Sequence, residues 1–175
     1  AKKQRNPVDR KALRDFFESD LPEVLADFEA REGQMAMAEA VADAFDGERI
    51  LLAEAGTGTG KSLAYLIPAI LWAKANDAKV VVSTYTRNLQ AQLVSSDIPL
   101  ALRSGLEFDW ALLKGRGNYV CRRKLALRRR EEPDSALWKR LSDWTDHSNE
   151  GSLQDLGEMV DDEDWEKVAS DTDHT

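Results

Sequence analysis

Apolar residues along the first 130 positions fall into runs whose spacing predicts helices and strands in turn. Helical spacing covers residues 9–30 and 33–45, with an interruption at Ser19-Asp20-Leu21-Pro22, where the proline suits an early helical position. Continuous apolar runs predict short buried strands at 49–54, 79–84 and 110–113, and the runs at 61–75 and 87–94 predict helices after the first two. This alternation predicts an α/β fold built on a parallel sheet.

The pattern changes after Tyr119, where apolar runs of strand type stop. Residues 121–130 and 135–144 have helical spacing, and the remainder is polar and acidic. Trp138, Trp144 and Trp165 are expected to pack against helices. We therefore divide the chain into residues 1–118 and 119–175, and we expect 131–175 to be loosely ordered.

A glycine-rich segment lies between the first strand and the helix that follows it: Ala55-Gly56-Thr57-Gly58-Thr59-Gly60-Lys61-Ser62. Its glycines let successive backbone N–H groups turn toward phosphate oxygens. Lys61 would reach the β- and γ-phosphates, and the Ser62 hydroxyl would bind Mg²⁺. A glycine-rich turn with a solvated lysine is the plainer alternative. The strand-loop-helix order favours a phosphate-binding loop (P-loop) for a nucleoside triphosphate.

The sheet that this pattern predicts is incomplete. A P-loop domain that hydrolyses nucleotide needs more strands than three, and a carboxylate on another strand to organise Mg²⁺ and water. The acidic run at 160–164 follows polar residues, so it does not have the pattern of such a strand. We expect part of a nucleotide-hydrolysing P-loop domain rather than all of one.

Composition places the chain among globular proteins: 42% of its 175 residues are hydrophobic and 32% are charged. It contains no run of 18 apolar residues, and its first residues lack the apolar stretch of a signal peptide. We expect a cytoplasmic protein with no membrane partner. A single cysteine excludes an internal disulfide framework.

Charge is divided unevenly along the chain. Up to Arg130 there are 21 Lys and Arg residues and 17 Asp and Glu residues. From Glu131 onward there are 3 Lys and Arg residues and 15 Asp and Glu residues. The net charge of -8 therefore comes from the last quarter of the sequence. An acidic total does not exclude nucleic acid as a partner of the first 130 residues.

Four segments in order carry a resemblance to a known family. They are Arg31-Glu-Gly-Gln34, Glu54 to Ser62, Ser83-Thr-Tyr-Thr-Arg-Asn-Leu-Gln-Ala-Gln-Leu93, and Leu113-Lys-Gly-Arg-Gly-Asn-Tyr-Val-Cys121. Together they resemble superfamily 2 DNA helicases of the DinG/XPD-like iron-sulfur family, of the bacterial DinG and YoaA type. The resemblance covers about residues 30–130 and implies a RecA-like P-loop fold followed by the helical start of an iron-sulfur cluster domain.

The resemblance also implies roles for individual residues. Gln34 would read the adenine edge, although a surface helix residue is the plainer alternative. ATP and Mg²⁺ would bind the P-loop, with Lys61 and Ser62 as catalytic residues. Thr84, Thr86 and Gln90 would hold single-stranded DNA phosphates, a role compatible with Thr86 simply capping a helix.

The fourth segment implies two further kinds of site. Lys114 and Arg116 would contact DNA, at the start of a basic cluster that reaches Arg130; a solvated helix face paired with the acidic tail is the alternative for 128–130. Cys121 corresponds to the first of four ligands of a [4Fe-4S] cluster. Since four thiolates are needed and this sequence has one, Cys121 cannot hold a cluster by itself.

We therefore expect an ATP-dependent 5′ to 3′ DNA helicase with a role in DNA repair, monomeric, acting on single-stranded or tailed duplex DNA. The 175 residues alone are expected to be inactive. Two alternatives stay open: a nucleotide- or DNA-binding module without turnover, and an unrelated P-loop NTPase such as a kinase. A kinase would have its P-loop on the first strand close to the N-terminus, which disfavours that reading.

Overall fold

The computed structural model describes residues 5–26, 28, 31–56, 60–157 and 159–170, and these form two compact units. Unit 1 is Ala1–Trp110 and unit 2 is Ala111–Thr175. The division falls before the boundary at 118/119 that the sequence suggested. The reason lies in Lys114, whose backbone N–H donates to the Tyr119 hydroxyl at 3.0 Å and whose ammonium donates to Ser152 at 2.9 Å, both within unit 2.

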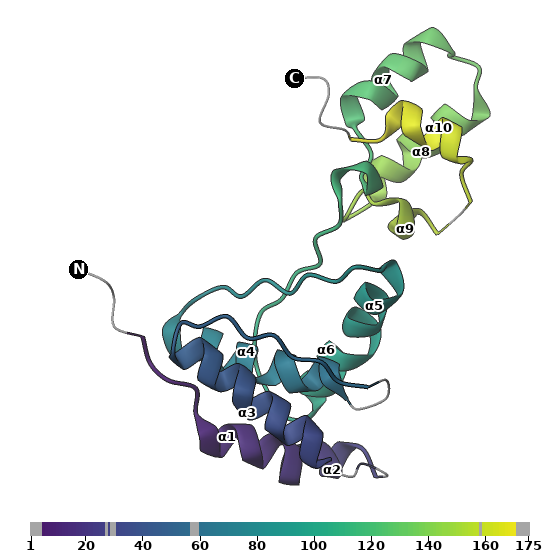
Figure 1. Cartoon of the computed structure of the whole chain (residues 1–175). Coiled ribbons are helices and arrows are strands. Elements are labelled where there is room, and N and C mark those ends of the chain that lie inside the picture. The colour runs from purple at the N-terminus through teal and green to yellow at the C-terminus, as the bar shows by residue number, and fades with distance from the viewer. Residues whose placement is uncertain (1–4, 27, 29–30, 57–59, 158, 171–175) are drawn as a thin grey trace. The chain divides into compact units, whose positions relative to one another are not determined.

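Unit 1 is helical in its described part (Figure 1). Its helices are α1 (Arg10–Asp15), the π-helix η1 (Phe16–Asp20), α2 (Leu21–Val24), α3 (Glu32–Asp46), α4 (Lys61–Asn76), α5 (Arg87–Gln92), the π-helix η2 (Leu93–Asp97) and α6 (Ile98–Arg103). The helices expected at 33–45, 61–75 and 87–94 are thus confirmed, and the last of them continues to Arg103. The helix expected at 9–30 ends at Val24, so that prediction was right only for its first part.

The core of unit 1 forms where α3 packs on α4. Ala38 and Ala42 are one turn apart on α3 and have no exposed surface, and Ala64 on α4 has none either. Small side chains on facing surfaces let two helices approach closely. Phe16 and Phe17 of η1 join the same core with ring centroids 5.2 Å apart, edge to face.

The predicted strands are absent from the described residues. Segments 49–54, 79–84 and 110–113 have no strand pairing, and Figure 1 shows the first two as connecting segments. Ile50, Leu52 and Val81 are about nine-tenths exposed. A strand exists only when a neighbouring backbone completes its hydrogen-bond ladder, and these segments have no such neighbour among the described residues. The parallel sheet is therefore not confirmed.

Unit 2 is a second helical assembly with its own core. It contains the 3₁₀-helix η3 (Arg116–Asn118) and the helices α7 (Arg122–Glu131), α8 (Ala136–His147), α9 (Leu153–Leu156) and α10 (Asp162–Val168). Isolated antiparallel bridges join Tyr119 to Ser152 and Val120 to Ala169.

The core of unit 2 is built by the segment expected to be loosely ordered. Trp138, Leu141 and Trp165 are at most 5% exposed, and Trp144 is partly buried beside them. The Trp165 indole donates to the Gly117 carbonyl at 2.7 Å. The expectation of loose order was therefore wrong for the described part of 131–170, because three tryptophans supply apolar surface for a core.

No helix in the described ranges is long and apolar enough to span a lipid bilayer.

Candidate functional site

The start of α4 carries the end of the P-loop. Gly60 immediately precedes the helix with φ 72° and ψ 27°, the left-handed conformation that glycine adopts without steric cost. Lys61 and Ser62 follow as the first two helical residues, where free backbone N–H groups and the helix dipole favour an anion. Thr57, Gly58 and Thr59 lie outside the described residues, so their predicted phosphate contacts stay predictions.

The Lys61 ammonium lies against the beginning of the same loop. It donates to the carbonyl oxygens of Ala55 at 2.6 Å and Gly56 at 2.8 Å. The side chain therefore runs back from the helix to the first residues of the loop. An ammonium in this place is within reach of an anion that the loop encloses, and such an anion would replace the two carbonyls as its partner.

Gln34 meets the other end of the loop. This residue of α3 is 3% exposed, and its side-chain nitrogen donates to the Gly60 carbonyl at 3.1 Å. The structure thus joins the upstream glutamine to the P-loop, two segments that the sequence analysis assigned to one nucleotide site. The surface-residue alternative for Gln34 is wrong, because the side chain is buried. Its adenine contact stays a prediction.

Polar side chains gather beside Ser62, and among them Asp97 is buried. The Asp97 carboxyl and the Tyr65 hydroxyl lie near the Ser62 hydroxyl. Asp97 is 7% exposed and accepts a hydrogen bond from the Gln92 amide at 3.4 Å. Burial raises the pKa of Asp97 above 3.8, while Ser62 and Gln92 act in the opposite direction. Burial likewise raises the pKa of Tyr65 above 10.0.

These residues fit a nucleoside triphosphate with Mg²⁺. A phosphate group needs cationic and N–H donors, which Lys61 and the start of α4 supply. Mg²⁺ takes oxygen ligands, and the Ser62 hydroxyl next to a buried carboxyl provides a suitable environment.

The predicted DNA-contacting segment begins α5. The Thr86 hydroxyl accepts from the Leu89 backbone N–H at 3.2 Å and so caps the helix, which confirms the plainer of its two readings. The Thr84 hydroxyl donates to the Thr86 carbonyl at 3.3 Å, and Gln90 lies one turn into the helix. The side chain of Tyr85 is fully exposed between the two threonines.

Lys114 and Arg116 have different surroundings in unit 2. The side chain of Lys114 is only 7% exposed, and its ammonium lies 3.5 Å from Glu150 and 2.9 Å from the Ser152 hydroxyl. Its charge is therefore already engaged within the unit. Arg116 is exposed at the start of η3. DNA contact stays a prediction for both residues. The side chain of Arg116 is more accessible to DNA than that of Lys114.

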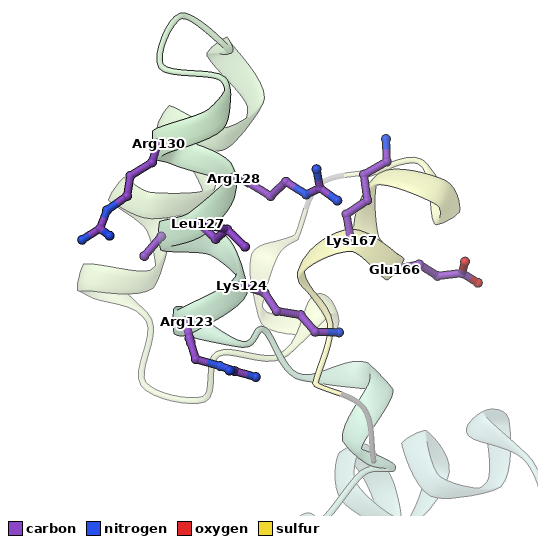
Figure 2. Close-up of a pocket in the computed structure, with 8 residues that line it drawn as sticks. Arg123, Lys124, Leu127, Arg128, Arg130, Glu166 and Lys167 are labelled. Atoms are coloured by element: carbon purple, nitrogen blue, oxygen red, sulfur yellow. The ribbon is translucent and has the colours of Figure 1, made fainter. Parts of the chain in front are cut away.

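A cavity of about 750 Å³ lies between α7 and α10 (Figure 2). It is lined by Arg123, Lys124, Ala126, Leu127, Arg128, Arg130, Glu166 and Lys167. We call it the basic groove. Five of its eight residues are cationic and one is acidic, and Leu127 adds a half-exposed apolar surface. The Arg128 guanidinium pairs with Glu131 at 3.0 Å, so the pairing expected between 128–130 and the acidic tail is partly present.

Cys121 is half-buried at the start of α7, and its backbone N–H donates to the Val168 carbonyl at 2.7 Å. No group of three or more His, Cys, Asp or Glu side chains that could hold a metal ion occurs within the described ranges. A [4Fe-4S] cluster needs four thiolates, so the residues of this chain alone do not fit it.

The sequence analysis missed Asp97, Tyr85 and Lys167. Asp97 belongs to no motif, and Ser62, near which the fold places it, is distant in sequence. Tyr85 could have been noticed as an aromatic residue between two candidate phosphate-binding hydroxyls. Lys167 lies in an acidic stretch, and only the packing of α10 beside α7 brings it to the basic groove.

Comparisons with known proteins identify a family for this chain. A family model described as DEAD/DEAH box helicase matches residues 32–164. The chain is 41% identical over 162 residues to the ATP-dependent helicase DinG of Mycobacterium tuberculosis, an alignment covering 79% of this chain and 24% of that protein. It is 36% identical over 165 residues to the ATP-dependent DNA helicase YoaA of Escherichia coli, covering 90% and 25%.

A third relative has a different printed activity. The protein named 3′-5′ exonuclease DinG of Bacillus subtilis is 36% identical over 167 residues, covering 89% of this chain and 17% of that protein. The chain spans about a quarter or less of the length of these curated relatives. The family match begins at the start of α3, ends within α10, and implies a RecA-like P-loop fold. With the glutamine and the P-loop in one unit, the chain belongs to the DEAD/DEAH box helicase family and is of the DinG and YoaA type.

Proposed function

We propose that this chain supplies the nucleotide-binding part of an ATP-dependent 5′ to 3′ DNA helicase, together with the start of an iron-sulfur cluster domain. The observation that carries the proposal is the arrangement at the start of α4, where left-handed Gly60 places Lys61 and Ser62 at the positive end of a 16-residue helix. The polarity rests on the family resemblance. Residues 1–118 would serve the motor domain and 119–175 the cluster domain.

Nucleotide binding is carried by residues that already face the loop. Lys61 would exchange the carbonyls of Ala55 and Gly56 for phosphate oxygens, a stronger charge-assisted bond. Ser62 would offer its hydroxyl oxygen to Mg²⁺. Gln34 would hold Gly60 in place from α3 and read the adenine edge. When bound, ATP with Mg²⁺ would supply the phosphoanhydride bond whose hydrolysis drives movement along DNA.

Single-stranded DNA binding is supported by the segment from Thr84 to Gln90. Thr84, Thr86 and backbone N–H groups at the start of α5 suit phosphate oxygens, which fixes a strand without reading its sequence. The exposed ring of Tyr85 suits stacking of a base, which every nucleotide can provide. Such a surface is appropriate to a motor that moves over any sequence.

A second contact with the DNA backbone is supported by the basic groove and by exposed Arg116. The groove combines cationic side chains with the apolar surface of Leu127, the composition of a site for single-stranded nucleic acid. We propose that the groove and Arg116 belong to the path of the separated strand. Lys114 would stabilise unit 2 rather than bind DNA, since its ammonium already interacts with Glu150 and Ser152.

Cys121 would contribute one thiolate to a [4Fe-4S] cluster if three further thiolates come from elsewhere. Because this chain does not supply them, we derive no step of the reaction from the cluster. The proposed helicase acts as a monomer in the cytoplasm, on single-stranded or tailed duplex DNA in repair.

The rival function is a nucleotide- or DNA-binding module without turnover. We expect the 175 residues alone to behave in this way, because no apolar strand in this sequence ends in the acidic pair that organises Mg²⁺ and water in such motors. The two functions therefore differ in what the full-length protein does, not in what this chain binds.

The deciding experiment measures ATP hydrolysis by the full-length protein, with and without single-stranded DNA, beside its Lys61→Ala variant. Stimulation by DNA that disappears in the variant supports the motor. Unwinding of a duplex with a 5′ single-stranded tail, but not of one with a 3′ tail, supports the polarity. Absence of stimulation in protein loaded with iron would leave the binding module as the function.

A further inference from the structure

The last residues of α3 and α4 are both contacted by the segment 5–14, which we call the N-terminal arm. The Asn6 backbone N–H donates to the Asn76 side-chain oxygen at 2.7 Å, and the Asn76 side-chain nitrogen donates to the Asn6 carbonyl at 3.0 Å. The Val8 backbone N–H donates to the Asp46 carboxylate at 2.8 Å. Since Asp46 ends α3 and Asn76 ends α4, the arm joins the two helices at this end.

Arg10 extends the contact of the arm along α3, which lies beside α1 (Figure 1). Its guanidinium donates to the carboxylates of Asp43 at 2.8 Å and Asp46 at 2.6 Å. It also donates to the Glu39 carbonyl oxygen at 3.3 Å. Arg14, one turn further along α1, pairs with the Glu39 carboxylate at 3.0 Å. The arm therefore holds successive turns of α3, which opposes both rotation and sliding of that helix.

A different face of α3 packs on α4. Its buried residues are Gln34, Ala38 and Ala42, one on each turn. Alanine side chains form shallow ridges, so they oppose sliding of one helix along another only weakly. Phe45 stacks on Trp72 with ring centroids 5.1 Å apart, and Gln34 contacts the start of α4. The two helices thus run side by side in the same direction.

The position of Gln34 depends on the register of α3 along α4. A shift of one residue moves a helical side chain by about 1.5 Å along the axis, which is enough to break the bond of 3.1 Å from Gln34 to Gly60. One hydrogen bond is a small contribution beside the contacts of a 15-residue helix. The register must therefore be fixed elsewhere, and the N-terminal arm supplies contacts that fix it at the other end of α3.

We infer that Arg10 is a positioning residue for Gln34. By fixing α3 against sliding, it keeps the glutamine amide at the P-loop, although the two residues lie at opposite ends of the helix. A rigid helix can transmit such a constraint over its length. The contact between Gln34 and Gly60 exists without nucleotide, whereas the consequence for adenine selection rests on the proposed function.

Nuclear magnetic resonance of the nucleotide-free, ¹⁵N-labelled 175-residue chain tests the positioning directly. The side-chain amide signals of Gln34 are identified by their loss in Gln34→Ala. In Arg10→Ala we expect these signals to shift toward those of solvated glutamines and to exchange with water at least about tenfold faster than in wild type. Lys11→Ala is the matched control and should leave them unchanged, since Lys11 pairs with Asp15 of its own helix.

Two features keep this test separate from general destabilisation. Ion pairs as accessible as those of Arg10 add little to folding stability, so Arg10→Ala should stay folded, as judged by circular dichroism. Arg10→Lys keeps the charge but lacks the planar fork that reaches two carboxylates, and it should give an intermediate shift. It carries the test if the alanine variant does not fold.

Titration with ATP and with GTP tests the consequence for the nucleotide site. We expect Arg10→Ala to lower the affinity for ATP about two- to tenfold, the value of one hydrogen bond, and to leave the affinity for GTP unchanged. In the Gln34→Ala background Arg10→Ala should add nothing, because the amide that it positions is gone.

Unchanged Gln34 signals in Arg10→Ala would overturn the inference, whatever the nucleotide affinities. Additive losses of ATP affinity in the double variant would also overturn it, since Arg10 would then act independently of Gln34. Shifted signals with equal losses for ATP and GTP would support positioning and contradict the adenine contact. If the chain binds no nucleotide, the proposed function fails, and the amide signals still decide whether Arg10 positions Gln34.

Discussion

Gln34 and Gly60 are joined by a hydrogen bond of 3.1 Å from the glutamine side-chain nitrogen to the glycine carbonyl oxygen. The same carbonyl accepts the Ala64 backbone N–H at 3.2 Å, so the bond from Gln34 is additional to the first turn of α4. The upstream glutamine is therefore part of the support of the P-loop even before any nucleotide is considered.

Gly60→Ala should abolish ATP binding and destabilise unit 1. A methyl group at this position would lie 2.1 Å from the Gln34 side-chain nitrogen, and a φ of 72° costs a residue with a Cβ about 1–2 kcal/mol. Calorimetric ATP titration and thermal unfolding measure the two effects. Gly33→Ala is the matched control, because no atom lies within 4 Å of its added methyl, and within a helix alanine is favoured over glycine by roughly 0.5–1 kcal/mol. Normal ATP affinity in Gly60→Ala would contradict the loop geometry described above.

Gln34→Ala should weaken ATP binding more than GTP binding. If the amide reads the adenine edge, its removal costs a hydrogen bond that guanine never made, with an expected loss of about 0.5–1.5 kcal/mol for ATP alone. Competition titrations with both nucleotides measure the difference. Equal losses for ATP and GTP would show that Gln34 acts through Gly60 and not through the base.

The P-loop could be found from sequence because its signal is local, whereas the upstream glutamine was found through the family resemblance. Spacing of glycines, lysine and serine specifies the loop, and apolar periodicity specifies α3 and α4. The strands could not be assigned reliably, since runs such as 79–84 become strands only beside a pairing partner, and none is present among the described residues. The position of Asp97 near Ser62 could not be predicted from sequence, because only the packing of η2 on α4 brings the two residues together.

Tyr85→Ala should weaken binding of single-stranded DNA by about 1–3 kcal/mol, the usual cost of losing one stacked base. The ring is fully exposed, so the substitution should leave the unfolding temperature unchanged. Fluorescence anisotropy with a labelled oligonucleotide measures the affinity. Tyr85→Phe keeps the ring and should bind as wild type does; the same loss in both variants would point to the hydroxyl and would contradict stacking.

Asp97→Asn should stabilise the chain at neutral pH, and this gain should shrink as the pH is lowered. Burial raises the pKa of Asp97 above 3.8, so the carboxyl contributes most to stability when protonated, and this contribution is lost as pH rises through the folded-state pKa. Asparagine has no charge to bury. Tyr65, the other titratable group in the cluster, has a pKa raised above 10.0 by burial and stays protonated throughout.

Urea unfolding of wild type and Asp97→Asn at a series of pH values between neutral and 3.8 measures this difference. A stability difference that does not change with pH would contradict a raised pKa.

The most direct test of the account is calorimetric titration of the chain with ATP and Mg²⁺, comparing wild type with Lys61→Ala and with Lys74→Ala. Lys74 lies on the last turn of the same helix and serves as the matched control. We predict that wild type and Lys74→Ala bind one ATP alike, and that Lys61→Ala loses about 1.5–3 kcal/mol, the usual value of a hydrogen bond to a charged group. Equal binding by all three proteins, or binding by none, would contradict a nucleotide site at the start of α4.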